Sequence, residues 1–221
     1  MIPQICSCGS KVDILNAHHF TACYEFRHFA HDTMVHEIKH MIRDVGVQVS
    51  IEVPAFSIFA NCTDKNLRVD LFSFSSNGNS PIVGDVTIRD PHPPSLENTN
   101  PADAFAVARS DKERKYLKYC EEAQFNLQVY AFDLYGRMSD EIFSLINTLN
   151  KSDKENSSCS RKQEKYNWTC PTFRKYWRQR LSCCLQRSLA ILVNKTMKQH
   201  SSSSFLFRGN WFKRNFSVSA S

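Results

Sequence analysis

Two runs of β-forming residues, 68–74 and 81–88, flank an Asn-Gly pair at Asn77 and Gly78. An Asn-Gly pair between two such runs is the strongest short-range signal for a β-hairpin, because both central residues of the tight turn have positive φ. If the turn is centred on this pair, opposed residues have numbers that sum to 77 + 78 = 155. The pattern therefore predicts both a hairpin and its register.

The predicted register sets two aspartates against each other. Asp70 and Asp85 satisfy the sum of 155, which brings their Cβ atoms to about 5 Å from each other on one face of the sheet. Like charges at opposed positions destabilise a sheet, and a shared divalent cation would remove the repulsion. We therefore expect Asp70 and Asp85 to bind Mg²⁺ or Mn²⁺.

Composition supports a folded protein with a modest basic bias. The 221 residues are 42% hydrophobic and include 16 Phe, enough for one domain and an appendage. A charged fraction of 23% with only 6 Gly argues against wholesale disorder. The formal net charge of +6 is compatible with a polyanionic partner.

No targeting or membrane segment is recognisable. The first residues lack the basic region and apolar stretch of a secretory signal, and no run of about 18 apolar residues suggests a transmembrane helix. We expect an intracellular, nuclear protein without membrane contact. Its nine Cys are then interpreted as thiols or metal ligands rather than disulfides.

Hydrophobic periodicity predicts an α/β (α+β) domain with a mixed sheet flanked by helices. In the helix at 32–45, Asp32 is the expected N-cap and Gly46 ends the helix. Its expected apolar stripe is Val35, Ile38, Met41, Ile42 and Val45. The other expected elements are a strand at 47–53, the hairpin at 68–88, a loop at 89–102, a helix at 103–121, a strand at 126–134 and a helix at 139–149.

The carboxy-terminal part divides into three segments. Residues 150–170 are polar and predict a linker, residues 171–198 predict a long helix packed on the core, and residues 199–221 predict a disordered tail. Arg178 and Arg180 lie among aromatic residues of this helix and are candidate DNA contacts on its outer side. The expected inner face is Phe173, Trp177, Leu181, Leu185, Leu189 and Leu192.

Residues 1–31 are rich in Cys and His and predict a zinc-knuckle-like segment. The candidate Zn²⁺ ligands are Cys6, Cys8, His19 and Cys23, two close pairs joined by a loop. His18 competes with His19, and His28 is a spare ligand. The alternative interpretation is a segment of free thiols and surface imidazoles.

The predicted helix after the hairpin adds a basic group to the acid pair. Lys112 and Lys115 are three residues apart and share one helical face. Two carboxylates and a nearby ammonium suit metal-assisted hydrolysis of a phosphodiester, in which the ammonium stabilises charge or orients water.

These residues carry a resemblance. The series Arg-X-Asp-Leu at 68–71, Asp-Val-Thr-Ile at 85–88 and Lys-X-X-Lys-Tyr at 112–116 resembles the PD-(D/E)XK endonuclease superfamily. It is most similar to the restriction-like endonuclease domain of non-LTR retrotransposon reverse transcriptase polyproteins. The Cys-X-Cys-Gly series at 6–9, the His-X-X-X-Cys series at 19–23 and the Arg-His pair at 27–28 resemble the zinc knuckle that precedes that domain.

The resemblance implies a restriction-endonuclease-like core over residues 32–149 with Asp70 and Asp85 as metal ligands. The position of the usual lysine is Thr87 here, so the resemblance implies that Lys112 or Lys115 replaces it from the following helix. Many such domains also carry an acid on the helix before the sheet, for which Glu37 is the candidate.

Two functions follow as hypotheses. The first is a retroelement-derived, metal-dependent DNA endonuclease, and the alternative is an inactive remnant that binds nucleic acid, DNA or RNA, or is purely structural. The first requires both carboxylates and one ammonium to converge within about 4–6 Å around one pocket. It fails if Asp85 points into the core and Asp70 into solvent.

Overall fold

A four-stranded mixed sheet forms the centre of the computed structural model, which describes residues 24–74, 80–91, 103–156 and 170–200. Its order is β1 (Val49–Pro54), β2 (Arg68–Ser73), β3 (Ile82–Arg89) and β4 (Asn126–Asp133). β1 pairs with β2 and β2 with β3 in antiparallel fashion, whereas β3 and β4 are parallel. The predicted mixed α/β architecture is confirmed.

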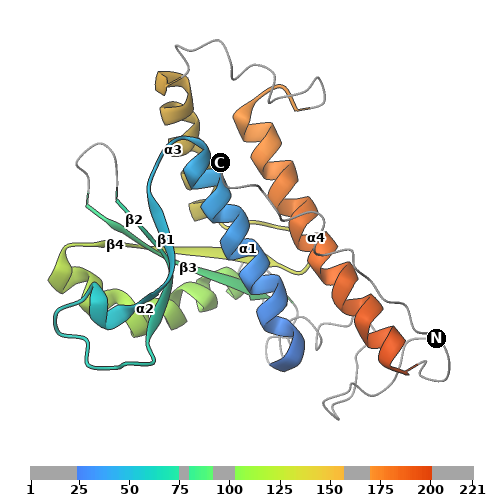
Figure 1. The fold of residues 1–221 in the computed structure, drawn as a ribbon, viewed down its shortest axis with the longest axis horizontal. Helices are drawn as coiled ribbons and strands as arrows, with labels where there is room; N and C mark the ends of the chain where they lie inside the picture. The colour runs from blue at the N-terminus through green and yellow to red at the C-terminus, as the bar shows by residue number, and fades with distance from the viewer. Residues whose placement is uncertain (1–23, 75–79, 92–102, 157–169, 201–221) are drawn as a thin grey trace, which may run out of the picture.

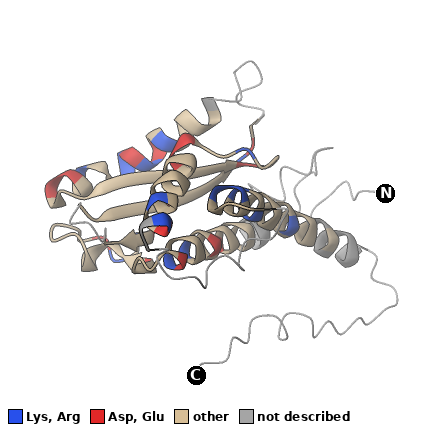
Figure 2. Ribbon diagram, turned by 90° about the horizontal axis from the view of Figure 1, so that it is seen from above, with Lys and Arg blue, Asp and Glu red and all other residues tan. Residues whose placement is uncertain are grey.

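Helices cover both faces of this sheet (Figure 1). α2 (Asp103–Ala123) is the crossover between the parallel strands β3 and β4 and lies on one face. The other side carries α1 (Tyr24–Asp44), α3 (Asp140–Asn156) and α4 (Phe173–His200). Each layer has its own apolar cluster, and charged residues lie mainly on the helices (Figure 2). Within the described ranges, no helix combines the length and apolarity needed to cross a membrane.

The hairpin register agrees with the prediction. The observed partners are Leu71 with Gly84, Phe72 with Val83 and Ser73 with Ile82, each summing to 155. The turn at 75–79 lies outside the described residues. The register nevertheless shows that the strand pairing implied by Asn77-Gly78 is the one adopted.

α1 is longer than predicted. It begins at Tyr24 rather than at residue 32, so Asp32 lies inside the helix and is not its N-cap. The predicted apolar stripe is buried from Val35 to Val45. Gly46 ends the helix with φ of +84°, a conformation that glycine adopts at little cost.

β1 departs from the simple alternation expected for residues 47–53. Ile51 packs in the cluster beneath α1, whereas Val53 packs in the cluster beneath α2. Glu52, between them, has φ of +53°, and this left-handed residue interrupts the period of two. The two side chains therefore reach opposite layers, which the sequence pattern did not predict.

The carboxy-terminal prediction is right for the helix and wrong at one boundary. α3 continues to Asn156, so residues 150–156 of the expected linker are helical. Residues 157–169 and 201–221 lie outside the described part, as do the candidate zinc ligands Cys6, Cys8, His19 and Cys23. The inner face of α4 is buried as predicted: Phe173, Trp177, Leu181, Leu185, Leu189 and Leu192.

Candidate active site

Asp70 and Asp85 lie where β2 and β3 separate. The described pairing of these strands ends at Leu71 and Gly84, and the two aspartates are the next residues in register. The backbone N–H of Val86 donates a hydrogen bond to Asp70 Oδ2 at 2.6 Å. The carboxylate thus satisfies a backbone donor of β3 at the point where strand pairing stops.

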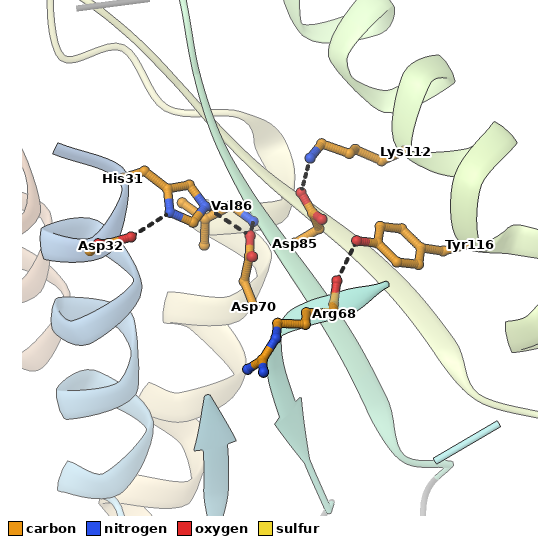
Figure 3. Close-up of polar contacts among 8 residues, drawn as sticks. All are labelled: His31, Asp32, Arg68, Asp70, Asp85, Val86, Lys112 and Tyr116. Carbon is orange, nitrogen blue, oxygen red and sulfur yellow. Dashed lines mark hydrogen bonds and ion pairs between the residues drawn. The ribbon is translucent and has the colours of Figure 1, made fainter. Parts of the chain in front are cut away.

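A cavity of about 510 Å³ opens at this separation, between α1 and α2. Asp70, Asp85, Lys112 and Lys115 all line it. The Lys112 ammonium contacts the Asp85 carboxylate in this cavity, and Asp70 lies in the wall of the same cavity. Figure 3 shows the Asp85 carboxylate against the Lys112 ammonium, and the Asp70 carboxylate against His31 and the backbone nitrogen of Val86.

Asp85 is the most buried acid of the cavity, with 1% of its surface exposed. The Lys112 Nζ atom lies 2.6 Å from its Oδ2. Burial raises the pKa of Asp85, the charge of Asp70 raises it further, and Lys112 opposes both effects. Lys112 therefore supplies the local positive charge that favours the ionised form of this carboxylate.

Lys115 occupies a different position. It is exposed, and its Nζ lies 4.8 Å from the centre of the Tyr116 ring. Of the two candidate lysines, Lys112 is the one that contacts a site carboxylate, while Lys115 stands at the edge of the cavity.

Tyr116 is a site residue that sequence reasoning missed, although it ends the Lys-X-X-Lys-Tyr series. Its hydroxyl donates to the backbone carbonyl oxygen of Arg68 at 2.6 Å. Burial raises the pKa of the phenol, and the charges of Asp85 and Asp70 raise it further. The hydroxyl therefore stays protonated and ties α2 to the start of β2 (Figure 3).

His31 is a second residue that was missed. Its Nε2 lies 3.0 Å from Asp70 Oδ2 and its Nδ1 lies 3.1 Å from Asp32 Oδ1. Burial lowers the pKa of the imidazole, but the hydrogen bonds and charges of Asp70 and Asp32 outweigh this and raise it to about 9. An adjacent His-Asp pair was the available signal, and it was overlooked because the helix was expected to begin at residue 32.

Glu52 and Asp32 add two further carboxylates to the wall of the cavity, which brings the total to four. The position of Glu52 in β1 opposes Asp70 in β2, because the β1–β2 partners sum to 122 on either side of it. Burial raises the pKa of Glu52, and the charge of Asp70 adds to the shift. His28, the spare zinc ligand of the sequence analysis, also lines this cavity.

Glu37 does not belong to this site, which corrects the prediction. It lines a separate cavity beside α4, and its Oε2 lies 2.6 Å from Arg180 Nε. Six residues separate Glu37 from His31, about 1.7 helical turns, so the two side chains leave α1 in different directions. The same ion pair engages Arg180, which was expected to face outward as a DNA contact.

The donor chemistry of the cavity fits a small hard cation. Among the residues that the structure describes, no cluster of three or more His, Cys, Asp and Glu side chains is arranged to hold a metal ion. The carboxylate oxygens of Asp70 and Asp85 in the cavity wall are of the ligand type that Mg²⁺ prefers. Mg²⁺ commonly binds through one or two carboxylates, with water and substrate phosphates completing the shell.

Comparison of the chain with protein-family models gives no match, and a search among curated proteins gives none either.

Proposed function

We propose that this chain is a metal-dependent DNA endonuclease domain of the PD-(D/E)XK type, derived from a non-LTR retroelement. The observation that carries the proposal is the convergence of Asp70, Asp85 and Lys112 on one cavity. Within the proposal, the mixed sheet with its acid pair beside the β2–β3 separation corresponds to a restriction-endonuclease-like core.

The proposed roles follow from burial and charge. Asp70 and Asp85 would hold Mg²⁺ or Mn²⁺, which would polarise the scissile phosphate. The Lys112 side chain is only 22% exposed. Its ammonium would stabilise negative charge that develops on the phosphate, or would orient the attacking water. Lys115, at the exposed edge, would contact a neighbouring backbone phosphate.

A nicking assay on supercoiled DNA with added Mg²⁺ tests the proposal. Asp70→Asn and Asp85→Asn keep the side-chain volume but remove the charged ligand, and we expect each to lower the nicking rate at least about 100-fold. Asp140→Asn, at the exposed start of α3, is the matched control and is expected to nick normally. Nicking by Asp85→Asn at the wild-type rate would refute the proposal.

One observation favours a second candidate, a remnant that binds nucleic acid without cleaving it. Each carboxylate already has a charge partner within the protein, His31 for Asp70 and Lys112 for Asp85, so neither depends on a metal for a nearby positive charge. This candidate predicts DNA binding that weakens with salt and is indifferent to both aspartate substitutions, with no nicking by any variant.

The candidate zinc segment is proposed as part of the same nucleic-acid-binding protein. Cys6, Cys8, His19 and Cys23 would hold Zn²⁺ in a tetrahedral site. Measuring zinc content of the purified chain and of Cys6→Ser tests this directly. We expect one equivalent of Zn²⁺ in the wild-type chain and none in Cys6→Ser.

A further inference from the structure

The contact between His31 and Asp70 carries an inference about how the site is built. We propose that His31 is a positioning residue, which holds Asp70 by its Oδ2 atom and thereby leaves Oδ1 for a metal ion. The proposal rests on the proposed function, because it assigns His31 a role toward the metal ligand of that same site.

Asp70 is held from two different elements. Its Oδ2 accepts hydrogen bonds from Val86 N of β3 at 2.6 Å and from His31 Nε2 of α1 at 3.0 Å. Oδ1 takes part in neither bond. Two donors on one oxygen restrict rotation of the carboxylate about its χ2 angle, a torsion that is otherwise broad for Asp.

His31 is itself held in place. Asp32 Oδ1 lies 3.1 Å from its Nδ1, so the imidazole is bonded at both nitrogens between two carboxylates. Carboxylates only accept, so both ring nitrogens act as donors in this arrangement. The series Asp32, His31 and Asp70 runs from a side chain that is 60% exposed to one that is 13% exposed (Figure 3).

This arrangement follows a general rule of metal sites. Carboxylates that bind metals are usually hydrogen-bonded by outer groups that fix their orientation, and losing such a group costs about 10–100-fold in metal affinity or activity. His31 has the geometry of such an outer group, because it contacts the carboxylate and lines the cavity. Asp32 is exposed and contacts His31 rather than Asp70, so its loss should lower metal affinity and activity less than the loss of His31.

The test compares two substitutions of similar size. His31→Gln keeps a side-chain N–H donor, whereas His31→Met fills the space without one. For His31→Met we expect a nicking rate constant and a Mn²⁺ affinity each lowered about 10–100-fold, with KM for DNA within about two-fold of wild type. His31→Gln should recover most of both losses, and Asp32→Asn should give a smaller loss than His31→Met.

His40→Gln is the control, since His40 is exposed on the same helix and does not line the cavity. Mn²⁺ binding is measured by electron paramagnetic resonance on the complete chain, and folding of each variant by thermal melting. If His31→Met does not fold, His31→Gln and Asp32→Asn decide. A Mn²⁺ affinity of His31→Gln that is as low as that of Asp70→Asn overturns the role, and so does a wild-type Mn²⁺ affinity of Asp32→Asn.

The outcomes separate the two proposals. If wild type binds Mn²⁺ and Asp70→Asn does not, but His31→Met behaves as wild type, the role of His31 is wrong and the nuclease proposal stands. Equal losses in the Met and Gln variants also overturn the positioning role. If wild type neither binds Mn²⁺ nor nicks DNA, the proposed function fails and the role of His31 fails with it.

Discussion

Lys112 and Asp85 form an ion pair of 2.6 Å that joins α2 to β3 at the floor of the cavity. The Asp85 side chain is 2% exposed, so solvent and salt screen the interaction weakly. Such a pair is costly to break from one side, because the remaining charge stays buried without compensation. The same contact therefore has consequences for stability and, under the proposed function, for catalysis.

Lys112→Met is expected to lower the free energy of unfolding by about 2–4 kcal/mol at pH 7 and to abolish nicking. The double variant Lys112→Met/Asp85→Asn removes the stranded charge, so it should recover most of the stability while staying inactive. Urea denaturation of both single variants and the double variant measures the coupling. If the stability losses of the two single variants add up to the loss of the double variant, the Lys112–Asp85 pair makes no net contribution to stability.

Glu37→Gln tests the correction that excludes this acid from the active site. The Glu37–Arg180 pair is partly exposed, with side chains 15% and 41% accessible, so its loss should cost about 1 kcal/mol or less. Nicking by Glu37→Gln should stay within about two-fold of wild type when measured below the melting temperature. A large loss of nicking without a loss of stability would return Glu37 to the catalytic machinery.

His31 makes the stability of the metal-free protein depend on pH. The folded protein holds the His31 proton more tightly, with a pKa of about 9 against 6.5 for an unperturbed imidazole. The stabilising contribution is therefore complete below about pH 6.5, declines as pH rises, and is lost above about pH 9. Relative to His31→Gln, wild type should lose on the order of 3 kcal/mol across this window.

Urea midpoints at pH 6 and pH 9.5, in the presence of a chelator, measure this difference. His31→Gln removes the titrating group and should leave only the pH dependence of the remaining chain. Parallel curves for the two proteins would mean that His31 and Asp70 are not coupled in the folded state.

Gly84 is required by packing rather than by backbone conformation. A Cβ atom at this position would lie 2.8 Å from Tyr130 Cε2 and 3.0 Å from Leu71 Cβ, and both neighbours are buried. Gly84→Ala should therefore destabilise the protein by about 1–3 kcal/mol. Thermal melting measures the change, and an unchanged melting temperature would show that the sheet and Tyr130 can shift to accept the methyl group.

Local patterns were sufficient for the framework of this protein. The Asn-Gly turn and its flanking β-forming runs predicted the strand register, although the pairing ends one residue before Asp70 and Asp85. The two aspartates contact helices on opposite faces of the sheet, α1 for Asp70 and α2 for Asp85. The apolar periods of α1 and α4 predicted their buried faces, because a helix repeats every 3.6 residues wherever it packs. These features depend on neighbours within one or two elements, which the order of residues specifies directly.

Local patterns did not predict which side chains from distant elements meet. His31 reaches Asp70 across 39 residues, Lys112 rather than Lys115 reaches Asp85, and Glu37 turns away toward Arg180. Each outcome depends on where α1 and α2 start and on how each helix is rotated about its axis against the sheet. The packing of the two apolar layers determines these rotations.

The sequence by itself determined the hairpin, its acid pair and the lysine-bearing helix that follows. The tertiary structure alone decided the remaining members of the cavity, including Glu52, whose positive φ breaks the alternation of β1. The physical reason is that periodicity reports burial along one element, whereas the partners of a polar side chain depend on how elements pack together.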